Sequence, residues 1–251
     1  MHSFKGKTVL ITGGSRGIGA ATVKLFAKLG ANVSFNYNTD RTSAEKLENE
    51  LQSHSTNYFY DQCDVSNHDD VKKLVRTTIE KFTQIDIFVN NAGIWEYGAI
   101  DTMTEKSWRR TMEINLDSIF YFTQEIVSHM KERKIHGRII YIASTAGQRG
   151  EAFHSHYAAS KGAIISFTKS LATELGPDGI YVNCVAPGWV DTDMSREAIS
   201  LAGEGLLETI PLRKIPLAED IAGPVVFLAS NWANAITGEI LNVNSGSVLC
   251  G

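Results

Sequence analysis

The stretch TVLITGGSRGIGAAT at residues 8–22 gives the clearest indication of the fold. Its first five residues are apolar or β-branched and predict a buried strand, and the segment that follows, GIGAATVKLFAKLG at 17–30, has the apolar spacing of a helix. Gly13, Gly17 and Gly19 lie at the junction. A glycine-rich turn that leads from a strand into a helix lets backbone N–H groups and the helix N-terminus approach a phosphate closely. The stretch therefore predicts a pyrophosphate-binding turn at the edge of a parallel sheet.

Short β-type runs alternate with helical patterns along most of the chain, which is typical of βαβ units. Further helical patterns stand at 71–82, 107–130 and 162–175. The predicted strands are TVLIT (8–12), NVSFNY (32–37), NYFYDQCDV (57–65), IDIFVNN (85–91), GRIIYIAS (137–144), IYVNCVAP (180–187) and EILNVN (239–244). Several are almost continuously apolar, as expected for strands that helices cover on both faces. We expect one α/β domain over residues 1–251, a Rossmann-type doubly wound parallel sheet of about seven strands with helices on both faces.

The segment MSREAISLAGEGLLETIPLRKIP, at 194–216, departs from this alternation and follows a predicted strand. Open parallel sheets bind ligands beyond the carboxyl ends of their strands. An irregular helical insertion at that place can cover a site, so we predict a substrate lid near 194–216.

Composition limits the class of protein. A chain of 251 residues with 43% hydrophobic content is long enough for one substantial core. The net charge of -4 and the mixed distribution of charges argue against nucleic acid or an anionic membrane as the main partner. Cys63, Cys184 and Cys250 are odd in number and lack metal-ligand spacing, so neither a disulfide framework nor a metal site is expected. Free thiols, the lack of a signal-type apolar region before the first strand, and apolar runs far shorter than a membrane span predict a cytoplasmic protein.

The segment HYAASKGA at 156–163 carries the chemistry, together with Ser144 at the end of an apolar run. Tyr157 and Lys161 are four residues apart and would share one face of a helix. A phenol exchanges protons poorly at neutral pH unless a cation stabilises the phenolate, and Lys161 could be that cation. Lowering the pKa of Tyr157 to near 7 would take about 4 kcal/mol.

These motifs together resemble the short-chain dehydrogenase/reductase family. The turn TGGSRGIG is similar to that family's TGxxxGIG form. NNAG (90–93), Asn115 in INL, Ser144, the YxxxK pair and PGWVDT (187–192) follow in the family's order, so the resemblance covers nearly the whole chain. It implies an oxidoreductase that interconverts a carbonyl and a secondary alcohol by hydride transfer with a nicotinamide cofactor.

The resemblance also implies the roles of single residues. Tyr157 would transfer the proton, Ser144 would hydrogen-bond the substrate oxygen, and Lys161 would lower the pKa of Tyr157 and bind the nicotinamide ribose. Asn115 would anchor a water that connects Lys161 to solvent. The cofactor contacts expected from the turn and from the resemblance are Gly13, Ser15, Arg16, Gly17, Ile18, Gly19, Asn36, Asp64, Val65, Asn91, Gly93, Tyr157, Lys161, Pro187, Gly188, Val190 and Thr192.

The second predicted strand bears on which nicotinamide cofactor is used. Relatives that prefer NAD usually end this strand with an acidic residue for the ribose 2′-hydroxyl, whereas this chain has Asn36, Tyr37 and Asn38 there. Arg16 inside the glycine turn could bind a 2′-phosphate, and Arg41 is a weaker choice. We therefore predict NADP(H) as the preferred cofactor, with NAD(H) as an alternative because Asp40 lies nearby in the chain.

The overall pattern is most similar to 3-oxoacyl-(acyl-carrier-protein) reductases, which implies a small-molecule or acyl-thioester carbonyl substrate. The stretch GEAFHSHY before and including Tyr157 departs from their GNxGQxNY form, and Ile135 and Thr173 replace basic residues that often dock the carrier protein. Sugar or polyol dehydrogenases of the glucose type remain an alternative. Aromatic side chains that could line the substrate pocket are Trp95, Tyr97, Phe153, His154 and Trp189.

A cofactor-binding sensor without catalysis is the alternative from another class of protein. Such proteins commonly lack the Tyr or the Lys, and both are present here, which favours an enzyme.

Relatives use a C-terminal strand and apolar tail like ITGEILNVNSGSVLCG (236–251) at subunit contacts, so we expect a homotetramer.

Overall fold

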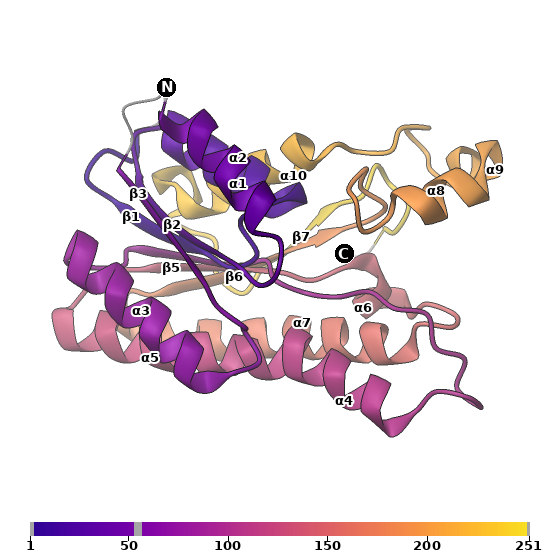
Figure 1. Ribbon diagram of the computed structural model, residues 1–251, viewed down its shortest axis with the longest axis horizontal. Coiled ribbons are helices and arrows are strands. Elements are labelled where there is room, and N and C mark those ends of the chain that lie inside the picture. Colours follow the sequence, from indigo (N-terminus) through magenta and orange to yellow (C-terminus); the bar gives the residue numbers. More distant parts are fainter. Residues whose placement is uncertain (1–2, 53–56, 250–251) are drawn as a thin grey trace.

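The computed structural model describes residues 3–52 and 57–249 and contains the predicted parallel sheet (Figure 1). The strand order is β3-β2-β1-β4-β5-β6-β7, and every neighbouring pair is parallel. The strands are β1 (Thr8–Ile11), β2 (Asn32–Tyr37), β3 (Tyr58–Gln62), β4 (Ile87–Asn90), β5 (Arg138–Ile142), β6 (Tyr181–Pro187) and β7 (Ile240–Val243). All seven fall within the segments predicted from the sequence, and the order reverses direction between β1 and β4, as in a doubly wound sheet.

Helices cover both faces of the sheet (Figure 1). One face carries α1 (Gly17–Lys28), α2 (Arg41–Gln52) and α10 (Ala218–Ala229), and the other carries α3 (His68–Phe82), α5 (Ser118–Arg133) and α7 (Ser155–Leu175). Side chains alternate between the two layers: Val9 and Ile11 of β1 belong to one hydrophobic cluster and Leu10 to the other. Both faces of the strand are therefore buried, which explains its unbroken apolar sequence.

Short helices complete the fold around the carboxyl ends of the strands. They are α4 (Glu105–Met112), α6 (Thr145–Arg149), α8 (Arg196–Ala202) and α9 (Glu204–Glu208). Two 3-10 turns, η2 (Gly176–Asp178) before β6 and η3 (Asn231–Ala233) before β7, lie at the opposite edge of the sheet. The sequence patterns that we singled out include neither α2 nor α10. Helix α2 is mostly polar and buries only Ala44, Leu47 and Leu51, so its apolar stripe is narrow.

The helix expected over 107–130 is interrupted. A π-helical turn, η1 (Glu113–Asp117), separates α4 from α5. Such wide turns occur often at functional sites, because they redirect a side chain that a regular helix would place elsewhere. Here the turn holds Asn115, which is fully buried.

The segment 194–216 forms α8 and α9, which contain no buried residue. The two helices stand at one end of the molecule (Figure 1). Their position beyond β6 agrees with an insertion at the carboxyl edge of the sheet, and their movement as a lid stays a prediction.

Two further expectations concern cysteines and membranes. Cys63 and Cys184 are free and buried, and Cys250 lies outside the described residues. Within 3–52 and 57–249, no helix combines the length and the apolar character needed to cross a membrane.

Candidate active site

The turn after β1 is packed so closely that two positions require glycine. Gly13 has a φ of 62°, a value that favours glycine. A Cβ on Gly19 would lie 2.1 Å from the carbonyl oxygen of Gly13. Amides from the neighbouring strands bind the turn: Asn36 Oδ1 accepts from the N–H of Gly13 at 3.0 Å, and Asn91 Nδ2 donates to the Gly13 carbonyl at 3.1 Å. The N-terminus of α1 is therefore held at the sheet edge, in the arrangement that binds a pyrophosphate.

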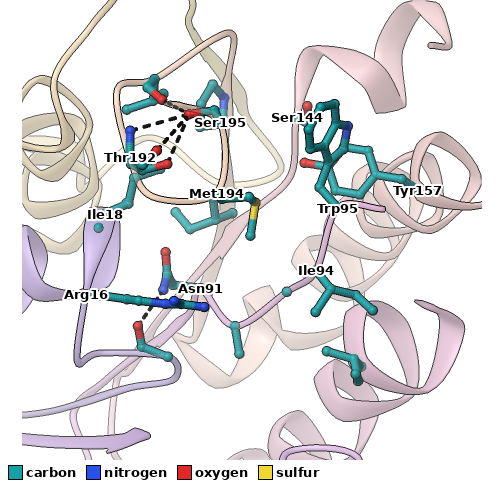
Figure 2. A pocket seen from close by; sticks show the side chains of 18 of the residues that line it. Arg16, Ile18, Asn91, Ile94, Trp95, Ser144, Tyr157, Thr192, Met194 and Ser195 are labelled. Atoms are coloured by element: carbon teal, nitrogen blue, oxygen red, sulfur yellow. Dashed lines mark hydrogen bonds between the residues drawn. The ribbon is translucent and has the colours of Figure 1, made fainter. Parts of the chain in front are cut away.

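A cavity of about 440 Å³ runs from this turn to α7. Figure 2 shows Arg16, Ile18 and Asn91 on one side of this view and Ser144, Tyr157 and Trp95 on the other. The predicted cofactor contacts that line the cavity are Gly13, Ser15, Arg16, Gly17, Ile18, Asn36, Asp64, Val65, Asn91, Gly93, Tyr157, Lys161, Pro187, Gly188, Val190 and Thr192. Gly19 does not line it and acts through packing. The donor set fits a dinucleotide, since it offers a helix N-terminus for phosphates and the Lys161 ammonium for hydroxyl groups.

At the adenosine end, Asn36 lines the cavity but its side chain serves the protein. The residue is 2% exposed, and Nδ2 donates to the carbonyl of Cys63 at 2.9 Å while Oδ1 binds the glycine turn. The side chains left to meet a ribose 2′ group come from the next residues, Tyr37 and Asn38, which also line the cavity. The end of β2 itself thus carries no carboxylate, and the acid that lines this end of the cavity is Asp40, three residues beyond the strand.

The charged residues near this end have different partners. Asp40 precedes α2 and accepts hydrogen bonds from the backbone N–H of Ser43 at 3.0 Å and from its hydroxyl at 2.6 Å. These bonds, and more weakly the charge of Arg16, lower the pKa of the Asp40 carboxyl. Arg41 Nε donates to Glu45 at 2.8 Å and does not line the cavity, whereas Arg16 is exposed and does. Of the two arginines considered for a 2′-phosphate, Arg16 therefore lines the cavity and Arg41 does not.

Asp64 and Val65 follow β3 and line the same end of the cavity. Asp64 Oδ1 accepts from the backbone N–H of Ser66 at 3.0 Å and from its hydroxyl at 2.7 Å. These contacts orient the carboxylate, and its Oδ2 takes no hydrogen bond from the described residues. That oxygen is available to an adenine amino group.

Three of the residues predicted to be catalytic come together at the other end. Ser144 follows β5 and caps α6, and its Oγ accepts the N–H of Ala146 at 3.1 Å. Tyr157 and Lys161 lie in α7, and Lys161 Nζ is 5.7 Å from the centre of the Tyr157 ring. Lys161 is 4% exposed and donates to the carbonyl of Ile142, the last residue of β5, at 2.7 Å. This bond uses one of the three ammonium protons and leaves two for a ligand.

Burial controls the protonation of this pair. It raises the pKa of Tyr157 to about 12, the hydrogen bond with Ser144 opposes this shift, and the charge of Glu151 adds to it. Burial also lowers the pKa of Lys161 to about 8. The phenol is therefore held neutral, as a proton donor, in the chain without cofactor. A lowering of the Tyr157 pKa by Lys161, expected from the sequence, does not occur in this state and stays a prediction for the loaded site.

Asn115 lies behind the cavity and does not line it. Its Oδ1 accepts the N–H of Ile94 at 2.8 Å, and its Nδ2 donates to the Ile94 carbonyl at 3.0 Å and to Ser160 Oγ at 3.1 Å. Ile94 follows the NNAG segment, so Asn115 positions the loop that leads from β4 along the cavity. The expected role as a water anchor stays a prediction.

The substrate side has an aromatic wall. Trp95 and Trp189 line the cavity and meet edge to face, with centroids 5.9 Å apart. Trp95 also stacks on His154 at 4.3 Å. Tyr97, Phe153 and His154 were predicted to line the pocket but do not: Tyr97 and Phe153 stack on each other outside it and are 68% and 58% exposed.

Glu151 and Arg149 line this wall as well, and the sequence reasoning did not single them out. Glu151 Oε1 accepts from Trp95 Nε1 at 3.2 Å. Their position in the sequence could have indicated them, because Glu151 lies within GEAFHSHY, the stretch that departs from the reductase pattern, and Arg149 directly precedes it.

Comparisons with known proteins agree with this geometry. The family model described as Enoyl-(Acyl carrier protein) reductase matches residues 13–247. A 3-oxoacyl-(acyl-carrier-protein) reductase of a Synechocystis species is 38% identical over 99% of this chain and 100% of its own length. The reductase of that name from Escherichia coli K12 is 37% identical over 97% of this chain and 98% of its own.

A solved structure supports the same placement. The crystal structure of a protein from Brucella melitensis, named "Short-chain dehydrogenase/reductase SDR:Glucose/ribitol dehydrogenase", covers 100% of both chains. Its TM-score is 0.93 and its sequence identity is 32%. The agreement therefore extends over the whole sheet and all of the covering helices.

Proposed function

Because the chain belongs to the short-chain dehydrogenase/reductase family, we propose that it is an NADPH-dependent ketoreductase that reduces the 3-oxo group of an acyl thioester. The observation that carries this proposal is that Ser144, Tyr157 and Lys161 share one cavity with the phosphate-binding turn. The reductases named among the relatives support the 3-oxoacyl substrate.

The side chains can hold and protonate a carbonyl oxygen. Ser144 Oγ accepts the N–H of Ala146, and its hydroxyl, which bonds Tyr157 in the chain without ligand, can turn to the substrate oxygen and stabilise developing negative charge there. Tyr157, whose pKa is raised to about 12, is protonated at neutral pH and can give its proton to that oxygen. When bound, the nicotinamide supplies the hydride. Lys161 is placed to donate to ribose hydroxyl groups with the protons that Ile142 leaves free.

The preference for NADP(H) rests on the adenosine end of the cavity. Tyr37 and Asn38 stand where relatives carry a carboxylate, Arg16 offers a cation, and Ser43 donates one hydrogen bond to each carboxylate oxygen of Asp40, which orients that side chain toward its own helix. A dehydrogenase that uses NAD(H) equally well is the alternative that the nearby Asp40 keeps open.

The substrate we propose is a small thioester rather than one borne by a carrier protein. The position expected to dock a carrier protein holds Ile135, which is only 9% exposed. At the second position, Thr173 donates its hydroxyl to the carbonyl of Lys169 at 3.2 Å. Neither side chain offers a cation to an acidic partner.

A sugar or polyol dehydrogenase is the second candidate. The similar protein from Brucella is named a glucose/ribitol dehydrogenase, and the cavity wall combines two tryptophans with the Glu151 carboxylate. Aromatic faces and carboxylates suit the C–H and O–H groups of polyols.

The test follows nicotinamide absorbance with NADPH and NADH separately, against acetoacetyl thioesters, diketones, aldoses and aromatic ketones. We expect fastest turnover with NADPH and a thioester. Tyr157→Phe should lower kcat by about 100- to 10,000-fold, since it removes the proton donor and keeps the ring. Tyr121→Phe, outside this cavity on α5, is the matched control. Full activity of Tyr157→Phe would contradict the mechanism, and NADPH binding without turnover of any substrate would favour a sensor.

We also propose a homotetramer in a reducing compartment such as the cytoplasm. The 50% exposed Phe120 on α5 supports contact between subunits, and the free thiols of Cys63 and Cys184 support the compartment. Light scattering that finds only monomer would count against the assembly, and a fluorescent fusion located elsewhere would count against the compartment.

A further inference from the structure

The carboxylate of Glu151 faces the reaction site, although the mechanism above does not use it. It lines the same cavity as Ser144 and Tyr157, and its charge acts on the Tyr157 phenol. Its side chain is 22% exposed, so it is partly desolvated but reachable by a ligand.

Neighbouring side chains fix the position of this carboxylate. Oε1 accepts from Trp95 Nε1 at 3.2 Å, and the same oxygen lies 3.8 Å from Nδ1 of His154. His154 is itself held, because its Nδ1 lies 3.0 Å from the carbonyl of Ala152 and its ring stacks on Trp95. A carboxylate that is oriented before the ligand arrives loses little entropy on binding.

The second oxygen of Glu151 is not used by the protein. Oε2 takes no hydrogen bond from residues 3–52 or 57–249, while an ionised carboxylate can accept about four. The two tryptophans beside it provide an apolar wall. An apolar ketone in this cavity would leave a partly desolvated acceptor unpaired, which is unfavourable.

We propose that Glu151 determines substrate specificity by accepting a hydrogen bond from an N–H or O–H donor that the substrate carries near its reacting carbonyl. This inference rests on the proposed ketoreductase function and adds the chemical class that the cavity selects. Trp95 acts as a positioning residue, because its indole N–H holds the other carboxylate oxygen.

Two kinds of substrate carry such a donor. A thioester with a pantetheine-like arm has amide N–H groups, and a polyhydroxylated ketone has hydroxyl groups. Two matched pairs separate them: the N-acetylcysteamine thioester of acetoacetate against its butyl thioester, and hydroxyacetone against butanone.

The experiment measures kcat/KM for both pairs in the wild-type protein, Glu151→Gln and Glu96→Gln. In the wild type we expect at least one pair to favour the donor-bearing member by about tenfold or more. Glu151→Gln keeps an acceptor for Trp95 but loses the charge. It should reduce this preference several-fold, chiefly through KM. Because the Glu151 charge also acts on Tyr157, the readout is the ratio of kcat/KM within each pair, in which a change in rate common to both members cancels.

Glu96→Gln is the matched control. Glu96 follows Trp95, lies 3.5 Å from Nε of Arg110 and does not line the cavity. We expect it to keep the wild-type preference. Trp95→Phe keeps the aromatic wall but frees the carboxylate, and it should weaken the preference as well.

The outcomes separate this inference from the proposed function. Turnover of the butyl thioester or butanone tests the ketoreductase function alone, since neither has a donor. Turnover without a preference in either pair, or a preference that survives Glu151→Gln, would overturn the role of Glu151. A preference confined to the thioester pair assigns the donor to an amide arm, and one confined to hydroxyacetone assigns it to a hydroxyl. If no ketone is reduced, the proposed function fails, and tryptophan fluorescence then tests whether hydroxyacetone binds more weakly to Glu151→Gln.

Discussion

The side-chain amide of Asn115 binds both backbone polar groups of Ile94, accepting its N–H at 2.8 Å and donating to its carbonyl at 3.0 Å. A side chain within a π-helical turn therefore makes the two hydrogen bonds that a neighbouring strand would otherwise make to the Ile94 backbone. Ile94 precedes Trp95 in the cavity wall. Because Asn115 is fully buried and makes both of these bonds, removing its amide leaves the two backbone groups of Ile94 without their protein partner.

Asn115→Ala should destabilise the protein and impair catalysis together. Leaving the Ile94 groups unpaired is expected to lower the free energy of unfolding by about 1–3 kcal/mol. We expect kcat to fall with it, because the loop beside Tyr157 loses its support. Urea unfolding and steady-state rates measure the two effects. Asn57→Ala removes an exposed amide that donates to Asn32 at 3.0 Å, and it should change neither. Wild-type stability of Asn115→Ala would show that the loop is held by other contacts.

Arg16→Gln should weaken the preference for NADPH. The substitution removes the cation that lines the cavity near Tyr37 and Asn38 and keeps a polar side chain. Loss of a charge-assisted contact should raise the KM for NADPH by roughly tenfold or more and leave that for NADH nearly unchanged. Arg41→Gln is the control, since Arg41 binds Glu45. Equal effects on both cofactors would place the 2′-phosphate elsewhere.

Cofactor affinity should decrease as the pH rises above about 8, the pKa to which burial lowers Lys161. Ligand hydroxyl groups that accept from the ammonium stabilise its charged form, so binding raises this pKa. Affinity is then highest below the pKa of the free protein and is lost as the pH rises from there toward the pKa of the complex. Fluorescence titration with NADPH across this range measures it. Lys161→Met should bind weakly at every pH, and an equally steep decline in that variant would assign the titration to another group.

His156 should make the fold sensitive to acid. Its side chain is fully buried, and neither ring nitrogen has a hydrogen-bond partner among the described residues. Burial, and to a lesser extent the charge of His154, lower the pKa of His156, while Glu96 acts in the opposite direction. The unfolded chain therefore binds a proton more readily, so this contribution to stability is present above about pH 6.5 and is lost as the pH falls through the folded-state pKa.

Urea unfolding at several pH values tests this sign. His156→Leu should show a smaller loss of stability below about pH 6.5 than the wild-type protein does. His136→Gln, which changes an exposed histidine, is the control and should keep the pH dependence of stability that the wild-type protein has. An unchanged slope in His156→Leu would assign the acid sensitivity to other groups, of which the buried His129, with a pKa that burial also lowers, is the first to test.

Local patterns along the chain were enough to predict the parallel sheet, the phosphate-binding turn and the Tyr157–Lys161 pair, whereas the role of Ser144 followed from the family resemblance. Apolar runs predicted the strands, and the glycines after the first strand predicted a turn in which Gly13 has a positive φ. The four-residue spacing of Tyr157 and Lys161 predicted that they share one helix face. Each of them can be recognised from a few neighbouring positions in the sequence.

Other features of the site became visible only in the folded chain. Asn36 serves the glycine turn, a π-helical turn presents Asn115 to Ile94, and Glu151 meets Trp95 at the cavity wall. Burial also opposes, in the absence of cofactor, the expected lowering of the Tyr157 pKa. These features depend on contacts between segments far apart in the sequence and on the water that folding removes, and periodicity along the chain carries no information about either.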